Sequence, residues 1–237
     1  MKKVFFVFNK MFQCLFIRFL DILFSFIAIV VLLPFMVPIM ILLKLTGEHD
    51  IFYVQKRVGR YGKEFNLLKF ATMLRNSPDL PGGIFTGEKD PRILPMGKFL
   101  RKTKINELPQ LVNILIGQMS VVGYRPLMRY SYEKYSDEVK QKIYYMKPGL
   151  SGIGSIVFRN EETIIQNIND KEKFYRNIVM PYKGKLESWF VENISILSYF
   201  KIILVTTIIV LKPSSLIWKR IFNNLPVAPK ELEIHIT

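Results

Sequence analysis

The longest feature of the hydrophobic pattern is an uncharged apolar run over residues 22–43. Nearly all of its residues are Leu, Ile, Val, Phe, Met or Ala. An α-helix of this length measures roughly 33 Å, which is enough to cross the hydrocarbon core of a bilayer. The run is too long for a cleaved signal peptide, and no small-residue cleavage site follows it. We therefore expect a membrane-inserted helix in this part of the chain.

Two prolines and the flanking charges bear on whether this helix crosses the membrane. Pro34 lies in the middle of the run and Pro38 follows one turn later. Each removes a helix hydrogen bond and favours a kink or a break. Lys and Arg residues flank the run on both sides, and the positive-inside rule places both flanks in the cytoplasm. A re-entrant helix that bends at Pro34 and returns to the same face satisfies both observations. An ordinary kinked transmembrane helix remains open as the alternative.

The rest of the pattern predicts an α+β domain that is mostly helical, with a small sheet or hairpin. Extended pieces around a turn are predicted for residues 51–73, and a loop for residues 74–95. Helical periodicity follows in four segments: 97–116 with an interruption near Pro109, 129–145, 162–180 and 194–211. A turn is expected at 147–152. The last helix contains the charge of Lys201, which favours a surface or core helix over a second membrane span.

These segments define three parts of the chain. We expect a membrane-inserted helix with basic flanks over residues 1–48, a cytoplasmic domain over 49–211, and a C-terminal tail over 212–237 that lies on the surface. No internal repeat or low-complexity tract interrupts them.

Charge narrows the choice of partners. There are 34 Lys and Arg residues against 19 Asp and Glu residues, so the formal net charge is +15 on a chain that is 50% hydrophobic. Such an excess suits nucleic acid, an anionic membrane surface or a phosphorylated substrate. A nucleic-acid-binding domain rarely opens with a long apolar run, so we expect membrane lipids and phosphate rather than nucleic acid. One cysteine and two histidines exclude internal disulfides and a Cys- or His-rich metal centre.

Two clusters of polar residues could carry chemistry. The first places Arg57 and Lys69 around the turn glycines of residues 59–62, where the backbone and the cations could hold an anion. A basic hairpin that rests on anionic lipid is the plainer interpretation. The second places Glu107 among basic residues, as phosphoryl transfer with a divalent metal requires. Glu107 could equally be a helix-start residue before Pro109.

In order and spacing, these motifs resemble the bacterial sugar transferase family, the small monotopic polyprenyl-phosphate phosphoglycosyl transferases. The resemblance covers about residues 15–211. Its motifs are Arg18-x-x-Asp21, Gln55-x-Arg57-x-Gly59-x-x-Gly62, Lys69-Phe70-x-Thr72-Met73, Asp90-Pro91-Arg92, Asn106-Glu107-Leu108-Pro109-Gln110-Leu111-x-Asn113, Gly117-x-Met119-Ser120-x-Val122-Gly123-x-Arg125-Pro126, Pro148-Gly149-x-x-Gly152 and Phe190-Val191-Glu192-Asn193-x-Ser195.

The resemblance implies an enzyme of the bacterial inner membrane whose catalytic domain lies on the cytoplasmic face. Such enzymes transfer a sugar 1-phosphate from a nucleoside diphosphate sugar to undecaprenyl phosphate in the presence of Mg²⁺. The product initiates the assembly of exopolysaccharide, capsule or lipopolysaccharide O-antigen. A catalytically inactive homologue that binds polyprenyl phosphate or scaffolds glycosyltransferases is the alternative.

The family's catalytic motif is altered in this sequence. In the family an Asp-Glu pair precedes Leu-Pro-Gln, and the Asp attacks the phosphate that bears the sugar. Here Asn106 occupies the Asp position, so we expect Glu107 to take the central role, as nucleophile or as general base, with Asn106 in a reduced capacity. Besides a catalytic Glu107 and an inactive homologue, a third possibility is that this branch of the family arranges the metal differently. Glu187 also differs, because it stands where the family usually has Asp.

The resemblance also implies the remaining members of the site. Glu107 and Asn106 are the candidate Mg²⁺ ligands. The candidate substrate- and phosphate-binding residues are Arg57, Lys69, Arg92, Arg101, Gln110 and Arg125.

Overall fold

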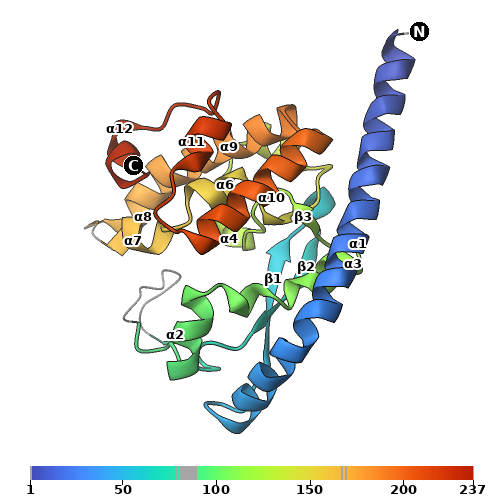
Figure 1. The fold of residues 1–237 in the computed structure, drawn as a ribbon. Helices are drawn as coiled ribbons and strands as arrows, with labels where there is room; N and C mark the ends of the chain where they lie inside the picture. The colour runs from blue at the N-terminus through green and yellow to red at the C-terminus, as the bar shows by residue number, and fades with distance from the viewer. Residues whose placement is uncertain (1, 78, 81–89, 167, 169, 237) are drawn as a thin grey trace.

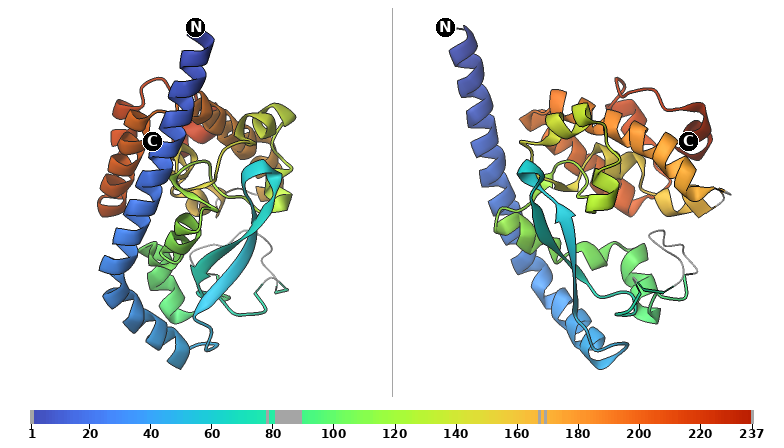
Figure 2. Two further views of the ribbon diagram at one scale, coloured as in Figure 1. Left: turned by 90° about the vertical axis from the view of Figure 1, so that its right-hand side faces the viewer. Right: turned by 180° about the vertical axis from the view of Figure 1, so that it is seen from behind.

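The apolar N-terminal sequence forms one long helix, α1 (Lys2–Leu45), which lies along the side of a mixed α+β domain (Figure 1). The computed structural model describes residues 2–77, 79–80, 90–166, 168 and 170–236. The helix stays α-helical through Pro34 and Pro38, so of the kink or break expected at the prolines, no break forms. Its axis instead bends toward the domain in its second half (Figures 1 and 2). Both prolines face away from the domain, and a proline opens a helix on its own side.

The two sides of α1 differ in character. Arg18 and Asp21 are the two charges between residues 12 and 43, and both face the domain. Arg18 donates hydrogen bonds to the carbonyls of Ile114 and Leu115 at 2.7 and 2.9 Å. The outward side exposes large apolar side chains to an extent that suits lipid rather than water. These include Phe12, Leu15, Phe19, Phe26, Val30, Val31, Phe35, Ile41 and Leu45.

The extended pieces predicted for residues 51–73 form a β-hairpin. β1 (Phe52–Val58) pairs antiparallel with β2 (Glu64–Phe70), and a short 3₁₀ turn (Arg60–Gly62) joins them. The turn has Tyr61 and Gly62 at φ of 62° and 66°, a left-handed conformation that glycine adopts without strain. Leu67 and Phe70 lie on opposite faces of β2, and both are buried, in two apolar clusters that also include residues of α1.

The segment after the hairpin is helical and interrupted near Pro109, as predicted. It contains α2 (Pro95–Lys102), a 3₁₀ turn η2 (Ile105–Glu107) and α3 (Gln110–Leu115). Pro109 lacks an N–H group, so it does not continue the turn and instead immediately precedes the first residue of α3. The loop predicted over residues 74–95 falls partly outside the described residues, at positions 78 and 81–89.

Two short strands link this segment to the helical half of the domain. β3 (Ser120–Val122) pairs parallel with β4 (Gly149–Ser151), so residues 147–152, predicted as a turn, include a strand. Residues 129–145 form two helices, α4 (Arg129–Tyr132) and α5 (Asp137–Ile143), where one was predicted. The division follows from Ser136, whose side chain accepts a hydrogen bond from the Val139 N–H and starts the second helix.

The C-terminal half is built from helices packed around one apolar cluster (Figure 2). They are α6 (Ile153–Val157), α7 (Glu161–Gln166), α8 (Lys171–Phe174), a π-helical turn η3 (Tyr175–Val179), α9 (Met180–Glu192) and α10 (Ile196–Leu211). Helix was predicted for residues 162–180, of which 167 and 169 lie outside the described residues. α10 buries one face and exposes the other, as expected of a surface or core helix.

The tail after residue 211 also joins this cluster. It contains α11 (Ile217–Ile221) and α12 (Lys230–Ile236). Trp218, Phe222 and Leu232 are buried in the same apolar cluster as the helical half, and the Tyr182 hydroxyl donates to the Pro226 carbonyl at 3.0 Å. The expectation that the tail simply lies on the surface is therefore wrong, because Trp218, Phe222 and Leu232 are removed from water.

Candidate functional site

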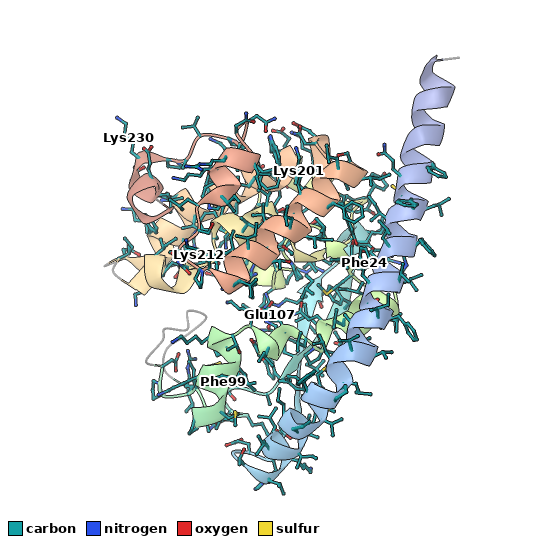
Figure 3. The ribbon with its side chains drawn as sticks, in the orientation of Figure 1. Phe24, Phe99, Glu107, Lys201, Lys212 and Lys230 are labelled. Atoms are coloured by element: carbon teal, nitrogen blue, oxygen red, sulfur yellow. The ribbon has the colours of Figure 1, made fainter. Side chains whose placement is uncertain are left out.

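A narrow pocket between the hairpin, α3 and the two short strands gathers most of the predicted site residues. Glu107 lies near the middle of the molecule, between the α2 region and the helical half (Figure 3). The residues that line the pocket are Arg57, Leu67, Lys69, Glu107, Gln110, Arg125, Pro126, Gly149 and Leu150. One carboxylate and three cations, from parts of the chain far apart in sequence, therefore meet in one place.

The hairpin supplies two of the cations. Arg57 lies opposite Phe65, and Lys69 lies opposite Tyr53, in the antiparallel register. Strand alternation puts Arg57 and Lys69 on the same face of the hairpin. The Arg57 guanidinium donates to the Pro126 carbonyl and, through Nε, to Gln55 Oε1, at 3.1 Å in both cases. These contacts fix the guanidinium beside the loop that carries Arg125.

The pocket lowers the pKa of both hairpin cations. Burial lowers the pKa of Lys69 to about 7, with Arg57 and Arg125 adding to the effect and Glu107 opposing it. Burial and the nearby Arg125 lower the pKa of Arg57 to about 10. Holding several cations close together out of bulk water raises the free energy of the protein unless an anion neutralises them. The pocket is therefore suited to a ligand with more negative charge than Glu107 alone provides.

Glu107 is presented by the 3₁₀ turn η2. Lys104, at φ of 62°, reverses the chain after α2, and its carbonyl accepts the Glu107 N–H at 3.0 Å. Burial alone would raise the pKa of Glu107, but Lys69, Arg125, Lys104 and Arg57 together hold that pKa below its usual value. Among the described residues, no cation forms a direct ion pair with Glu107. The carboxylate is thus ionised and remains available to a ligand.

Arg125 is held from behind by the helical half. Its N–H donates to Glu187 Oε1 at 3.3 Å, and its Nη1 donates to Ser155 Oγ at 3.4 Å. Burial opposes the charge of Arg125, yet Glu107 and Glu161 raise the pKa of the guanidinium above its ordinary value. Arg125 is therefore a permanent cation at the pocket.

Asn106 has a different environment from its neighbour Glu107. Its side chain is buried, with 7% exposure, and it is absent from the described residues that line the pocket. Its Oδ1 atom is buried and accepts no hydrogen bond from a described residue. Gln110, also buried, does line the pocket at the start of α3.

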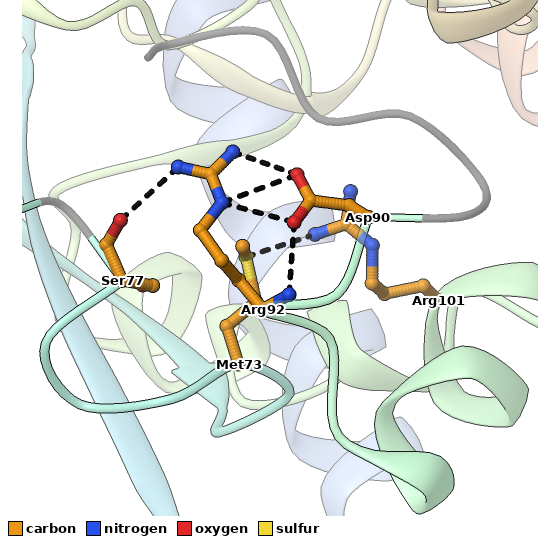
Figure 4. Close-up of polar contacts among 5 residues, drawn as sticks. All are labelled: Met73, Ser77, Asp90, Arg92 and Arg101. Atoms are coloured by element: carbon orange, nitrogen blue, oxygen red, sulfur yellow. Dashed lines mark hydrogen bonds and ion pairs between the residues drawn. The ribbon is translucent and has the colours of Figure 1, made fainter. Parts of the chain in front are cut away.

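Arg92 and Arg101 are placed outside this lining. Arg92 is 3% exposed and forms a forked ion pair with Asp90, with Nη2 and Oδ2 2.7 Å apart (Figure 4). Its Nη1 also donates to the Ser77 carbonyl at 3.1 Å. Arg101 Nη1 contacts Met73 Sδ at 3.8 Å and acts on Lys69 at longer range. The structure thus gives Arg92 an acid partner of its own, whereas Arg57, Lys69 and Arg125 share the pocket.

Some members of the site were missed by the sequence reasoning. Gly149 and Leu150 line the pocket, and Ser155 and Glu187 brace Arg125. Gly149 stands in a motif that the resemblance includes, and Glu187 in a position noted for its acid, so both had a signal. Ser155 had none.

No cluster of three or more His, Cys, Asp or Glu side chains suited to a metal occurs among the described residues. A Mg²⁺ ion often needs only one or two carboxylates, because waters and substrate phosphates complete its shell. Glu107 meets this requirement, and the preceding residue in sequence, Asn106, has an Oδ1 atom with no hydrogen-bond partner among the described residues. The donor set therefore fits a Mg²⁺ ion that binds together with a phosphorylated ligand.

Comparison with known proteins places the pocket in context. Residues 12–213 match the family model described as bacterial sugar transferase. The chain is 37% identical over 207 residues to the galactosyl transferase CpsE of Streptococcus agalactiae, covering 82% of this chain and 42% of that protein. It is 32% identical over 214 residues to the undecaprenyl-phosphate galactose phosphotransferase of Salmonella typhimurium, covering 82% and 41%.

A shorter relative aligns over more of its own length. The exopolysaccharide production protein ExoY of Sinorhizobium fredii is 34% identical over 158 residues, covering 61% of this chain and 70% of that protein. The chain spans only about two fifths of the length of the first two relatives.

Proposed function

Because the chain belongs to the bacterial sugar transferase family, we propose that it transfers a sugar 1-phosphate from a nucleoside diphosphate sugar to undecaprenyl phosphate. This reaction would initiate exopolysaccharide, capsule or lipopolysaccharide O-antigen assembly. The observation that carries the proposal is the meeting of Glu107 with Arg57, Lys69 and Arg125 in one pocket. Relatives named as an undecaprenyl-phosphate galactose phosphotransferase and as an N-acetylgalactosaminephosphotransferase support the same reaction.

The pocket cations suit a diphosphate. Arg57, Lys69 and Arg125 neutralise the phosphate oxygens and the charge that accumulates on them during transfer. Arg125 presents a fixed cation from the helical half while the hairpin presents the other two. Binding from two sides orients the anhydride and shields it from water.

Glu107 acts as the nucleophile in this proposal. The acceptor is already a phosphate anion, so it has no proton that a general base must remove before it attacks. Among the described lining residues, Glu107 alone carries an anionic oxygen. Its carboxylate oxygen bonds to the phosphorus that bears the sugar, and the anhydride bond breaks with its electron pair on the departing nucleoside monophosphate. A lipid phosphate oxygen then attacks that phosphorus, and the bond to Glu107 breaks to regenerate the carboxylate.

Mg²⁺ is the proposed cofactor, held by Glu107 and by Asn106 through its unbonded Oδ1. When bound, the ion would supply further neutralisation of the diphosphate. Asn106 contributes a neutral amide oxygen, which is a weaker ligand than the carboxylate of an Asp.

The membrane arrangement we propose is re-entrant, on the cytoplasmic face of the inner membrane. Just before the apolar run, near the middle of α1, the helix is fixed to the domain by Asp21, which accepts hydrogen bonds from Ser120 and Tyr199. Near its end, Met36 and Leu43 pack in one apolar cluster with residues of β2 and α2. One domain therefore contacts both halves of the apolar segment, which favours a single side of the bilayer. The outer apolar face of α1 then contacts membrane lipids.

The test is a transfer assay with purified protein in lipid nanodiscs. Undecaprenyl phosphate, Mg²⁺ and a panel of nucleoside diphosphate sugars are supplied, and nucleoside monophosphate release is measured. We expect release with at least one donor. Glu107→Gln should abolish it, whereas Glu138→Gln, a matched change at an exposed glutamate of α5, should leave it within about twofold of wild type.

Two further results sharpen the assay. Asn106→Asp should raise the rate, because it adds a carboxylate beside Glu107. Omitting the lipid should still allow up to one equivalent of nucleoside monophosphate per protein, since the first displacement does not need the acceptor. Survival of activity in Glu107→Gln would contradict the assignment of this residue. Absence of release across the panel, with lipid binding retained, would favour the alternative, a binding or scaffolding homologue.

A further inference from the structure

A buried carboxyl group outside the pocket is attached to one of its cations. Glu187 lies on α9 with 1% exposure. Its Oε1 accepts the Arg125 N–H at 3.3 Å, and its Oε2 has no hydrogen-bond partner among the described residues. Burial raises the pKa of Glu187 to about 7, against the nearby Lys183 and Arg125. A buried carboxyl group with an oxygen that accepts no hydrogen bond lowers the stability of the fold. Packing alone therefore does not explain the presence of a glutamate here.

The space for this carboxyl depends on a glycine. A Cβ atom at Gly154, on α6, would lie 2.5 Å from Glu187 Oε1 and 3.3 Å from its carboxyl carbon. Contacts between a Cβ and another heavy atom are not made this close, so any larger residue would displace the carboxyl from the Arg125 N–H. Since Glu187 is enclosed on all sides, its end cannot swing into solvent to make room.

The neighbouring residue on α6 reaches the other end of Arg125. Ser155 Oγ accepts a hydrogen bond from Arg125 Nη1 at 3.4 Å. Glu187 thus fixes the backbone of Arg125 while Ser155 touches its guanidinium, and Gly154, which faces Glu187, directly precedes Ser155 in sequence. Both contacts come from the helical half, and Arg125 reaches from there toward the hairpin cations and Glu107.

We infer that Glu187 and Gly154 form a size-matched pair that positions Arg125 for the phosphate in the pocket. The long acid reaches the Arg125 N–H only because the facing position has no side chain. Glu187 is a positioning residue, since it is absent from the described lining of the pocket and acts through Arg125. The inference takes its substrate, a diphosphate, from the proposed function. The effect of the Glu187–Gly154 pair on Arg125 can nevertheless be measured by ligand binding, without turnover.

The pairing makes a prediction for three variants. Glu187→Asp shortens the acid by one methylene and withdraws the acceptor from Arg125, and Gly154→Ala drives the acceptor away. A displacement of about 1 Å at a positioning group can cost about 100-fold in rate, so each single change should lower kcat/KM by about 10- to 100-fold. In the double variant the shorter acid leaves room for the methyl group that Gly154→Ala adds, but it still does not reach the Arg125 N–H. We expect its kcat/KM to match that of Glu187→Asp, well above the product of the two single effects, because Gly154→Ala acts only by displacing the long acid.

The control is Glu187→Gln, which keeps the length and an acceptor oxygen for the Arg125 N–H. It should retain kcat/KM to within about threefold of wild type, because the proposed role needs an acceptor and not a charge. The thermal midpoint of each variant is measured beside the rate. A merely structural role would lower the midpoint and leave kcat/KM per folded molecule unchanged.

Binding of inorganic pyrophosphate, followed by calorimetry, separates this inference from the proposed function. We expect the two single variants to bind pyrophosphate more weakly than wild type and the double variant to bind it about as well as Glu187→Asp does. That pattern in a protein without transferase activity would leave the inference standing and the proposed function contradicted. Transfer activity in wild type together with single losses that multiply in the double variant, in rate and in pyrophosphate binding, would overturn the inference.

Discussion

Arg92 and Arg125 occupy two arginine sites that the sequence does not distinguish. Each is a predicted phosphate-binding arginine next to a proline. Arg92 is 3% exposed and has Asp90 bound to its guanidinium through several hydrogen bonds (Figure 4). Arg125 has its backbone fixed by Glu187, and its guanidinium meets the neutral hydroxyl of Ser155 and the pocket.

The difference teaches what makes a cation available to a ligand. An arginine whose charge is matched by a carboxylate at 2.7 Å has little to gain from a phosphate, because the phosphate would have to displace that acid. An arginine held by its backbone and by a neutral oxygen keeps its charge for a ligand. The Arg92 side chain therefore holds Asp90 and the Ser77 carbonyl together, and Arg125 serves the pocket.

The largest expected effect comes from removing the pocket arginine. Arg125→Met should reduce transfer by about 100- to 1,000-fold, as expected when one fixed group that stabilises transition-state charge is lost. The thermal midpoint should change little, because no carboxylate among the described residues forms a direct ion pair with the Arg125 guanidinium. Steady-state kinetics measure the loss, and Arg129→Met, at an exposed arginine of α4, is the matched control. Near-wild-type rates in Arg125→Met would erase the contrast between the two arginines.

At Arg92 we expect the opposite result, a loss of stability with little change in rate. Arg92→Met leaves Asp90 buried without its cation and should lower the free energy of unfolding by about 2 kcal/mol. Asp90→Asn in the same chain should restore part of that loss. Denaturant melts in detergent measure stability, and the rate per folded molecule should stay within about threefold. A rate that falls as far as in Arg125→Met would instead place Arg92 in substrate binding.

The smallest expected effect is a pH dependence at the third pocket cation. The pKa of Lys69 is lowered to about 7, so the side chain is charged below that pH and neutral above it. The donor diphosphate has no ionisation between pH 6 and 9. The KM for the donor at saturating lipid should therefore rise by about tenfold between pH 6.5 and 8.5, since a charge-assisted contact is lost. Lys69→Arg, which stays charged, should give a flat profile. A wild-type profile as flat as that of the variant would remove Lys69 from phosphate binding.

Local signals in the sequence predicted much of the fold. The hairpin over residues 51–73 follows from alternation and turn glycines, and the interruption before α3 follows from Pro109. The errors have local causes as well. Ser136 divides the predicted helix over residues 129–145 because its side chain caps a new one, and β4 forms at a predicted turn because β3 is there to pair with it.

The site was predicted in part. Glu107, Gln110, Arg57, Lys69 and Arg125 line one pocket, whereas Asn106, Arg92 and Arg101 are absent from its described lining. The family pattern drew attention to all of these residues alike. It contains no information on the partner that each side chain finds, and that partner decides the role.

The amino-acid sequence by itself determined that an apolar helix and a basic domain belong to one chain, because hydrophobic runs and charge counts are properties of composition and order. It also determined which residue types are available for phosphate chemistry. Only the tertiary structure decided that α1 bends around the domain instead of breaking, and that Asp90 neutralises Arg92. It likewise decided that Gly154 makes room for Glu187 behind Arg125. These outcomes depend on contacts between segments distant in the chain, where the geometry of packing sets which charges are matched and which remain for a ligand.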